Sequence, residues 1–161
     1  MSRKSSFSGA TLTIKVTESL TIDGRDYGGS ASTTIASVKN VTRRIETVTT
    51  AEATIVNFDT AIGPGQYVPA NVAYMRFTNL DDTNFITLTL KNANGDECAI
   101  KVDAGQTFML AGDNSGGMAA MMNATENADA ASSTNLANLA DIQADADTAS
   151  CHMENYIAAT A

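Results

Sequence analysis

The first part of the chain alternates between apolar and polar side chains, which is the pattern of a β-strand with one buried face. Within residues 11–22, Leu12, Ile14 and Val16 alternate with threonine and lysine. A period of two places the apolar side chains on one face, and β-branched residues favour extended backbone. The glycine-rich residues 23–29 follow, and glycine accepts the positive φ that tight turns need. We therefore predict a strand followed by a turn.

The next stretch, residues 33–50, fits two periods. Its apolar residues recur every three or four positions, as in an amphipathic helix: Ile35, Val38, Val41, Ile45 and Val48. Its high content of threonine and valine favours a strand instead. We predict extended chain with a bend near Asn40, then a strand over Ala53–Phe58 and a loop at residues 63–69. That loop contains both prolines of the chain, and proline with glycine marks loops.

The middle of the chain has the clearest strand pattern. Apolar and polar residues suited to strands occupy residues 72–78, 85–90 and 98–102. A polar turn at residues 79–84 separates the first two segments, and Asn94-Gly95, a strong hairpin signal, separates the second and third. We therefore predict an antiparallel meander of three strands, followed by a further strand at residues 107–110.

The composition changes from Ala111 onward, where alanine alternates with Asn, Ser, Asp and Gly. Residues 112–133 are predicted as a long surface loop, a feature that often serves contacts. Residues 134–147 fit both a short helix, by the spacing of Leu136, Leu139 and Ile142, and a strand with small side chains on one face. We predict a final hairpin whose turn lies near residues 148–150.

Eight to ten short strands with hardly any helix predict an all-β protein. The expected fold is an antiparallel β-sandwich, jelly-roll-like, with a long Ala/Asn/Gly-rich loop before a C-terminal hairpin. A length of 161 residues and a hydrophobic content of 43% fit one globular domain. We predict a flexible N-terminal arm over residues 1–10 and a single sandwich domain over residues 11–161.

The charge is negative and unevenly spread. Ten basic and eighteen acidic residues give a net charge of −8, which argues against nucleic acid as the main partner. No apolar run reaches the roughly 18 residues of a membrane helix, so no membrane partner is expected. Residues 1–44 carry an excess of basic residues and residues 45–161 an excess of acidic ones. We interpret the acidic part as a solvated surface. In the alternative, the basic part of one copy faces the acidic part of another.

The titratable residues do not predict a catalytic site. His152 is the one histidine, and its neighbour Cys151 would point to the opposite face of a strand. A Cys–His pair is therefore not expected to form there. Cys98 and Cys151 are expected to be reduced core residues. We predict a protein that is not an enzyme.

Metal and phosphate sites are also not predicted, and no cofactor is expected. Asn79, Asp81, Asp82 and Asn84 carry oxygen atoms that suit calcium, but they lack the spacing and the glycine of a calcium loop. A turn explains them better, because Asn and Asp are frequent in turns. One histidine with two distant cysteines is a poor ligand set for zinc. The glycine-rich residues 112–117 lack the Gly-Lys-Ser/Thr of a phosphate loop.

Three groups of residues are candidates for contacts with a partner, each with a structural alternative. A basic pair within a strand contacts a partner or protects a sheet edge by its charge. A second basic pair belongs to the N-terminal arm, which becomes ordered on assembly or remains a frayed end. Three methionines adapt to a neighbour's surface or cover the edge of the sandwich. The basic pair within a strand is Arg43 and Arg44, the pair in the N-terminal arm is Arg3 and Lys4, and the methionines are Met118, Met121 and Met122.

One passage combines strands and turns in a recognisable order. Residues 72–81, with Thr78-Asn79-Leu80-Asp81, lead into residues 84–88, and Asp103-Ala104-Gly105-Gln106-Thr107-Phe108 follows the hairpin. This order of strand, Thr-Asn-x-Asp, strand, hairpin and x-x-Gly-x-x-Phe resembles a passage in small structural proteins of tailed bacteriophages. The likeness covers roughly residues 10–111.

The resemblance implies a component of the virion that is assembled in the host cytoplasm. The expected function is that of a capsid decoration (cement) protein, which self-associates, by our prediction as a trimer, and docks onto other virion proteins such as a major capsid protein. The alternatives are a tail, head–tail connector or fibre component, or a carbohydrate-binding β-sandwich module. Such a module would use exposed aromatic side chains, for which Tyr27 and Tyr67 are the candidates.

Overall fold

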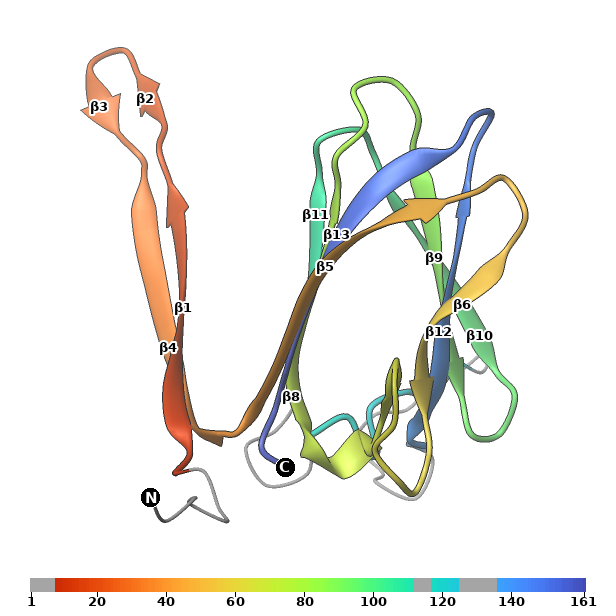
Figure 1. The fold of residues 1–161 in the computed structure, drawn as a ribbon. Helices are drawn as coiled ribbons and strands as arrows, with labels where there is room; N and C mark the ends of the chain where they lie inside the picture. The colour runs from red at the N-terminus through yellow and green to blue at the C-terminus, as the bar shows by residue number, and fades with distance from the viewer. Residues whose placement is uncertain (1–7, 112–116, 125–135) are drawn as a thin grey trace, which may run out of the picture.

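A computed structural model describes residues 8–111, 117–124 and 136–161, and it contains two sheets that face each other in a β-sandwich (Figure 1). The five-stranded sheet has the order β10 (Glu97–Val102), β9 (Ile86–Asn92), β12 (Leu139–Ala146), β6 (Ala53–Phe58) and β7 (Gln66–Tyr67). The four-stranded sheet has the order β11 (Thr107–Ala111), β8 (Val72–Asn79), β13 (Cys151–Ala159) and β5 (Asn40–Val48). Neighbouring strands are antiparallel except β6 and β7, which are parallel. The predicted all-β sandwich is confirmed.

The core lies between the inner faces of the two sheets. Met75 and Phe77 of β8 and Ile157 of β13 are buried against Leu88 of β9 and Ile142 of β12. Burying a side chain of this size stabilises the fold by roughly 1.5–3 kcal/mol. The core consists mostly of aliphatic side chains, and the aromatic Phe77 is its largest fully buried member.

A long hairpin stands outside both sheets. Strands β1 (Ala10–Glu18) and β4 (Gly29–Val38) pair with each other, and β2 (Thr21–Ile22) and β3 (Arg25–Asp26) extend them to the turn. The turn residues Asp23 and Gly24 have φ of 49° and 76°. Two positive φ values are those of a type I′ turn, for which Asp-Gly is a preferred pair. The hairpin, red to orange in Figure 1, leaves the sandwich at its base and runs beside it.

The predicted bend near Asn40 is confirmed. β4 ends at Val38 and β5 begins at Asn40, so the chain breaks at Lys39 between the hairpin and the sandwich. The Lys39 N–H donates to the carbonyl of Ala159, at 2.9 Å, and fixes the bend to the last strand. The strand predicted at Ala53–Phe58 is β6.

The predicted meander is wrong in one strand. β9 and β10 form the hairpin expected at Asn94-Gly95, but β8 belongs to the other sheet, where it pairs with β11 and β13. The chain crosses between the sheets at residues 80–85. The buried Asn79 amide supports this crossing by donating to the carbonyls of Asn84 and Val102, at 2.8 and 3.2 Å. Alternation indicates which face of a strand is buried and leaves its sheet undetermined.

The predicted C-terminal hairpin is also corrected. Both strands and the turn occur, and residues 139–146 form a strand rather than a helix. However, β12 lies between β9 and β6, and β13 lies between β8 and β5. Each strand therefore has two other neighbours, and the connection passes from one sheet to the other. Of the loop predicted at residues 112–133, only residues 117–124 are among those the structure describes.

Candidate interaction surface

The β1–β4 hairpin has one apolar and one polar face. Residues that lie opposite each other in the two strands point to the same face. The apolar face pairs Leu12 with Ile35, Ile14 with Thr33, and Val16 with Ala31. The polar face pairs Thr13 with Thr34, Lys15 with Ser32, and Thr17 with Ser30. A two-stranded hairpin is stable in water only when something packs against its apolar face.

The sandwich covers only the base of this face. Ile35 and Val38 are buried in a second hydrophobic cluster with Ala73, Tyr74 and Ala158 of the four-stranded sheet. Leu12, Ile14 and Tyr156 pack against this cluster and are partly buried. The hairpin is therefore anchored to the outer face of the four-stranded sheet, the face turned away from the core.

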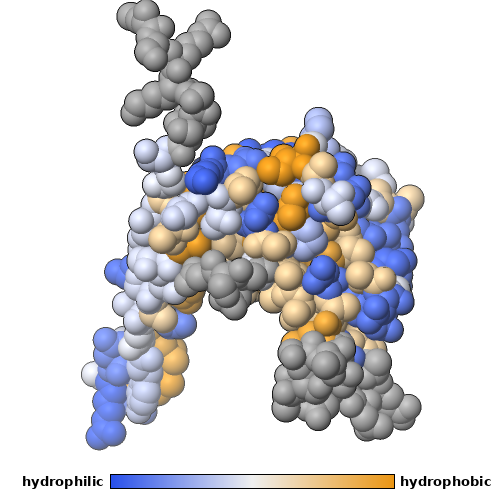
Figure 2. All heavy atoms as spheres, turned by 90° about the horizontal axis from the view of Figure 1, so that it is seen from below, coloured by the Kyte–Doolittle hydropathy of each residue, from blue (hydrophilic) through white to orange (hydrophobic). Residues whose placement is uncertain are grey.

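Toward the turn, the apolar face is uncovered. Leu20 and Tyr27 lie opposite each other, joined by the Tyr27 N–H to Leu20 carbonyl hydrogen bond of 2.8 Å. Ile22 lies two residues further along the same face. Leu20 is 50% exposed, Ile22 51% and Tyr27 59%. Figure 2 shows the apolar residues along the side of the hairpin that is turned toward the sandwich.

The outer face of the four-stranded sheet is uncovered as well. Val41 and Ile45 of β5 and Met109 of β11 are exposed there, Ile45 by 61%. The pairing of β5 with β13 places Ile45 opposite Glu154, and that of β11 with β8 places Met109 opposite Arg76. These residues therefore share one face.

An ion-pair cluster lies at the centre of this outer face. The carboxylate of Glu154 accepts hydrogen bonds from Arg43, at 2.8 Å from Nη2 to Oε2, and from Arg76, at 2.5 Å from Nη2 to Oε1. Hydrogen bonds from Arg43 and then Arg76 lower the pKa of Glu154, which stays ionised. Two guanidinium groups share one carboxylate, so this face has a surplus of one positive charge in a chain of net charge −8.

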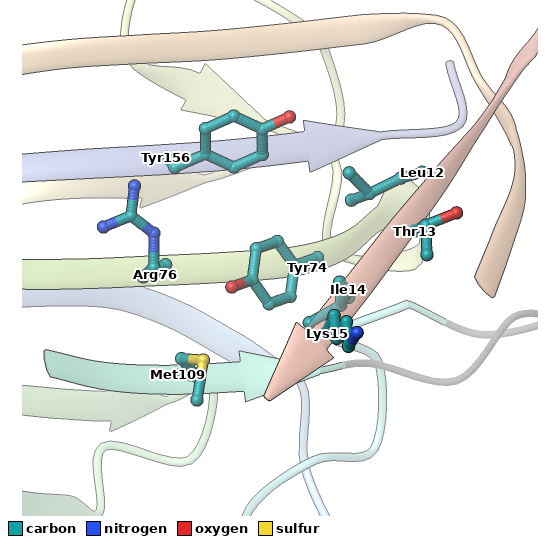
Figure 3. Close-up of a pocket in the computed structure, with 8 residues that line it drawn as sticks. All are labelled: Leu12, Thr13, Ile14, Lys15, Tyr74, Arg76, Met109 and Tyr156. Carbon is teal, nitrogen blue, oxygen red and sulfur yellow. The ribbon is translucent and has the colours of Figure 1, made fainter. Parts of the chain in front are cut away.

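A groove lies between β1 and this outer face (Figure 3). It has a volume of about 290 Å³. The hairpin side consists of residues 12–15, and the sheet side of Tyr74, Arg76, Met109 and Tyr156. The rings of Tyr74 and Tyr156 meet edge to face with centroids 6.0 Å apart, and the Arg76 guanidinium lies 5.9 Å from the Tyr156 centroid. The groove thus offers aromatic and cationic groups side by side.

The structure separates the two arginines that the sequence places together. Arg43 lies on the outer face of β5 and pairs with Glu154. Arg44 points to the inner side, where its Nη2 donates to the Ile55 carbonyl at 3.1 Å and lies 3.1 Å from Glu46 Oε2. β5 is the edge strand of its sheet. The other basic pair, Arg3 and Lys4, lies outside the described residues.

The three methionines proposed for partner contacts lie in or against the main core. Met118 is fully buried in the main core, and Met121 and Met122 pack against that core and are partly buried. This placement agrees with the interpretation that these residues cover the edge of the sandwich. The fully buried Met118 has no surface left for a partner.

The two cysteines differ. Cys151 is buried on the inner face, as predicted, while His152 beside it is exposed on the outer face with Nδ1 3.5 Å from the Thr47 hydroxyl. Burial, followed by the nearby Asp81 carboxylate, raises the pKa of the Cys151 thiol. The prediction that Cys98 is a core residue is wrong, because Cys98 is exposed on β10, the edge strand of the five-stranded sheet.

In the acidic turn at residues 79–84, a side-chain carboxylate accepts hydrogen bonds from backbone N–H groups of the same turn. Asp81 accepts hydrogen bonds from the N–H groups of Thr83, at 2.8 Å, and Asn84, at 2.6 Å. These bonds lower the pKa of Asp81, with Asn84 contributing most. Among the described residues, no group of three or more His, Cys, Asp or Glu side chains has a geometry suited to a metal ion.

The two tyrosines proposed for carbohydrate contacts have different environments. Tyr27 is exposed near the turn of the hairpin. Tyr67 is buried, and its hydroxyl donates to the Thr42 hydroxyl at 2.9 Å. Tyr67 is therefore unavailable as a stacking platform.

No protein-family model matches the chain, and no curated protein is significantly similar to it. In the described part of the chain, no helix has the length and apolarity needed to cross a membrane. Two uncovered apolar surfaces, the hairpin end and the outer face of the four-stranded sheet, are the candidate contact surfaces of the described residues.

Proposed function

We propose that this chain is a non-enzymatic virion structural protein, a capsid decoration (cement) protein that self-associates and docks onto other virion proteins. The observation that carries the proposal is the β1–β4 hairpin, whose apolar face is covered only at its base. Exposed apolar patches on a soluble protein mark surfaces that bind another molecule. A hairpin anchored at one end and uncovered at the other is well suited to reach a neighbouring subunit.

The charge distribution supports association between copies. Most of the molecule is acidic, while the outer face of the four-stranded sheet has its surplus positive charge at Arg43 and Arg76. Opposite charges on two parts of one chain favour contact between copies in a fixed orientation. A closed trimer is the assembly we expect, with a major capsid protein as the further partner. A tail, head–tail connector or fibre component would use the same surfaces.

The test is the solution mass of the purified full chain, measured by light scattering over a range of concentrations and salt. A defined oligomer supports the proposal, and an oligomer that persists at raised salt shows that apolar contacts dominate over charge. A monomer at every concentration contradicts self-association.

A carbohydrate-binding module is the second candidate, and the exposure of Tyr27 favours it. Aromatic rings in such sites stack on sugar rings, and Tyr27 is the exposed aromatic residue of the described chain. If this candidate holds, Tyr27→Ala abolishes retention on immobilised glycans while the solution mass remains unchanged. Retention that is the same with and without the ring contradicts it.

A further inference from the structure

Exposed large apolar side chains are concentrated on two surfaces of the described residues. Of eight such side chains, only Ile62 and Leu80 lie elsewhere. Three belong to the end of the hairpin: Leu20, Ile22 and Tyr27. The other three belong to the outer face of the four-stranded sheet: Val41, Ile45 and Met109. Scattered single apolar residues are ordinary on a protein surface, whereas two clusters of this kind require an explanation.

The hairpin leaves the outer face of its own sheet open. Ile35 and Val38 fix its base against Tyr74, and from there the hairpin runs away from β11, β13 and β5 (Figure 1). Ile45 and Met109, which lie on that sheet face, stay exposed although the hairpin begins beside it. The hairpin end and the sheet face therefore remain available for contacts between molecules.

The two surfaces match in length and charge. Val16 to Ile22 spans seven residues, as does Val41 to Thr47 on β5, and the six steps between the first and last residue of such a strand extend for about 20 Å. The hairpin end, residues 16–31, carries one basic and three acidic side chains, a net charge of −2. Of these, Glu18 and Arg25, which lies opposite Ile22, are on the apolar face. The sheet face carries a net charge of +1, because Arg43 and Arg76 share Glu154. Glu18 makes no ion pair with any described residue.

We propose that the hairpin end of one copy, residues 16–31, lies on the outer face of the four-stranded sheet of a second copy. The apolar side chains of the hairpin end then cover Val41, Ile45 and Met109. Glu18, which points to the apolar face between Val16 and Leu20, supplies a carboxylate beside Arg43. This inference rests on the self-association proposed above and names the surfaces that make the contact.

Copies of the chain can exchange hairpin ends, because each copy carries both a hairpin end and an open sheet face. One copy gives its hairpin end and receives that of a neighbour, which gives a closed pair or ring where the rotation between copies closes and an open filament where it does not. The polar face of the hairpin, with its serines and threonines, stays turned to solvent or to a polar neighbour. The groove between β1 and the sheet marks where the incoming hairpin enters.

Cross-linking between two variants tests the contact directly. Both variants carry Cys98→Ser, which removes the exposed native thiol; one also carries Ile22→Cys and the other Ile45→Cys, with a tag of different size on each. Mild oxidation of the mixture is expected to give a disulfide-linked heterodimer in at least fivefold excess over a control. The matched control replaces Ile22→Cys by Thr21→Cys, whose side chain points to the opposite face of the hairpin. Equal yields from the two mixtures would overturn the inference.

Solution mass separates failure of this inference from failure of the proposed function. Ile22→Asp is expected to raise the dissociation constant of the oligomer at least tenfold, while Ile62→Asp, at an exposed site elsewhere, leaves it unchanged. Circular dichroism verifies that both variants stay folded. If the native chain is an oligomer and Ile22→Asp leaves its mass unchanged, self-association stands and the hairpin contact is wrong. If the native chain is a monomer, both proposals fail.

Discussion

The sandwich and the β1–β4 hairpin use the same alternating pattern with opposite results. In β8, alternation places Met75 and Phe77 in a core where they lose all contact with water. In the hairpin, the same alternation leaves Leu20 and Ile22 half exposed. The difference lies in the partner: the sandwich has a second sheet, and the hairpin end has none within the chain. Alternation therefore shows that a face is apolar without showing which molecule covers it.

The two regions are joined through one small cluster. Within the described residues, β1 and β4 pair only with each other, and Ile35, Val38 and Tyr74 connect them to the sandwich. A segment with few buried contacts opens at a lower free energy than the main core does. We therefore expect substitutions in the core to lower the free energy of unfolding most, and substitutions in the connecting cluster and on the outer face to lower it less.

The largest effect is expected from Phe77→Ala. Removing this ring leaves a cavity between the sheets, and Phe→Ala in a core costs about 3–5 kcal/mol of unfolding free energy. The measurement is urea denaturation followed by circular dichroism. The contrasting variant Ile22→Ser, at the hairpin end, is expected to change the unfolding free energy by at most about 0.5 kcal/mol in the monomer. A comparable loss from both variants would show that the hairpin end is part of the folding core.

A smaller and local effect is expected from Ile35→Ala. The change removes contacts with Tyr74 in the connecting cluster, and truncation of a buried isoleucine costs about 2–5 kcal/mol when the site does not collapse. We expect faster amide hydrogen exchange in β1 and β4 and unchanged exchange in β8 and β13. Faster exchange throughout the sandwich would mean that the hairpin and the sandwich fold as one unit.

Much of the local structure was predictable because short segments determine it. The break at Lys39, the strand Ala53–Phe58 and the turn at Asn94-Gly95 each follow from the residues within them. Sheet membership was not predictable, since β8 and β9 are adjacent in sequence and lie in different sheets. Burial of each strand between two others depends on the whole topology, which no local period encodes.

The candidate surface was predictable only in part. Successive side chains of a strand point to opposite faces, so one arginine of the Arg43-Arg44 pair has to point outward, and Arg43 does. Its carboxylate partner, Glu154, is 111 positions away in the chain, and nothing near either residue connects them. Leu20 and Ile22 lie within or beside the strand predicted over residues 11–22, but their lack of a cover depends on where the hairpin lies in space.

Glu154→Gln is expected to lower the free energy of unfolding of the sandwich moderately. The change removes the charge shared by Arg43 and Arg76, and hydrogen bonds to charged groups contribute about 1.5–3 kcal/mol when buried and less when partly exposed. Because the pKa of Glu154 is lowered in the folded state, its contribution is present above the unfolded pKa of about 4.3 and is lost as the pH falls through the folded value.

The measurement is the urea midpoint of the native chain and Glu154→Gln between neutral and acid pH. We expect the two midpoints to differ at neutral pH and to converge as the pH falls below about 4. Curves that remain parallel would mean that the carboxylate contributes through shape rather than charge.

The smallest effect, with the opposite sign, is expected at Asp145 on the outer face of the five-stranded sheet. Desolvation, followed by the nearby Glu52 carboxylate, raises the pKa of Asp145. A raised carboxyl pKa means that the ionised form opposes folding at neutral pH; this cost decreases as the pH falls through the folded value and is gone below the unfolded value. Asp145→Asn is therefore expected to raise the urea midpoint slightly at neutral pH and to leave it unchanged at acid pH. A lowered midpoint would show that this carboxylate stabilises the sheet. In that case, an ionised carboxylate would stabilise the outer face of each sheet, Glu154 on the four-stranded sheet and Asp145 on the five-stranded sheet.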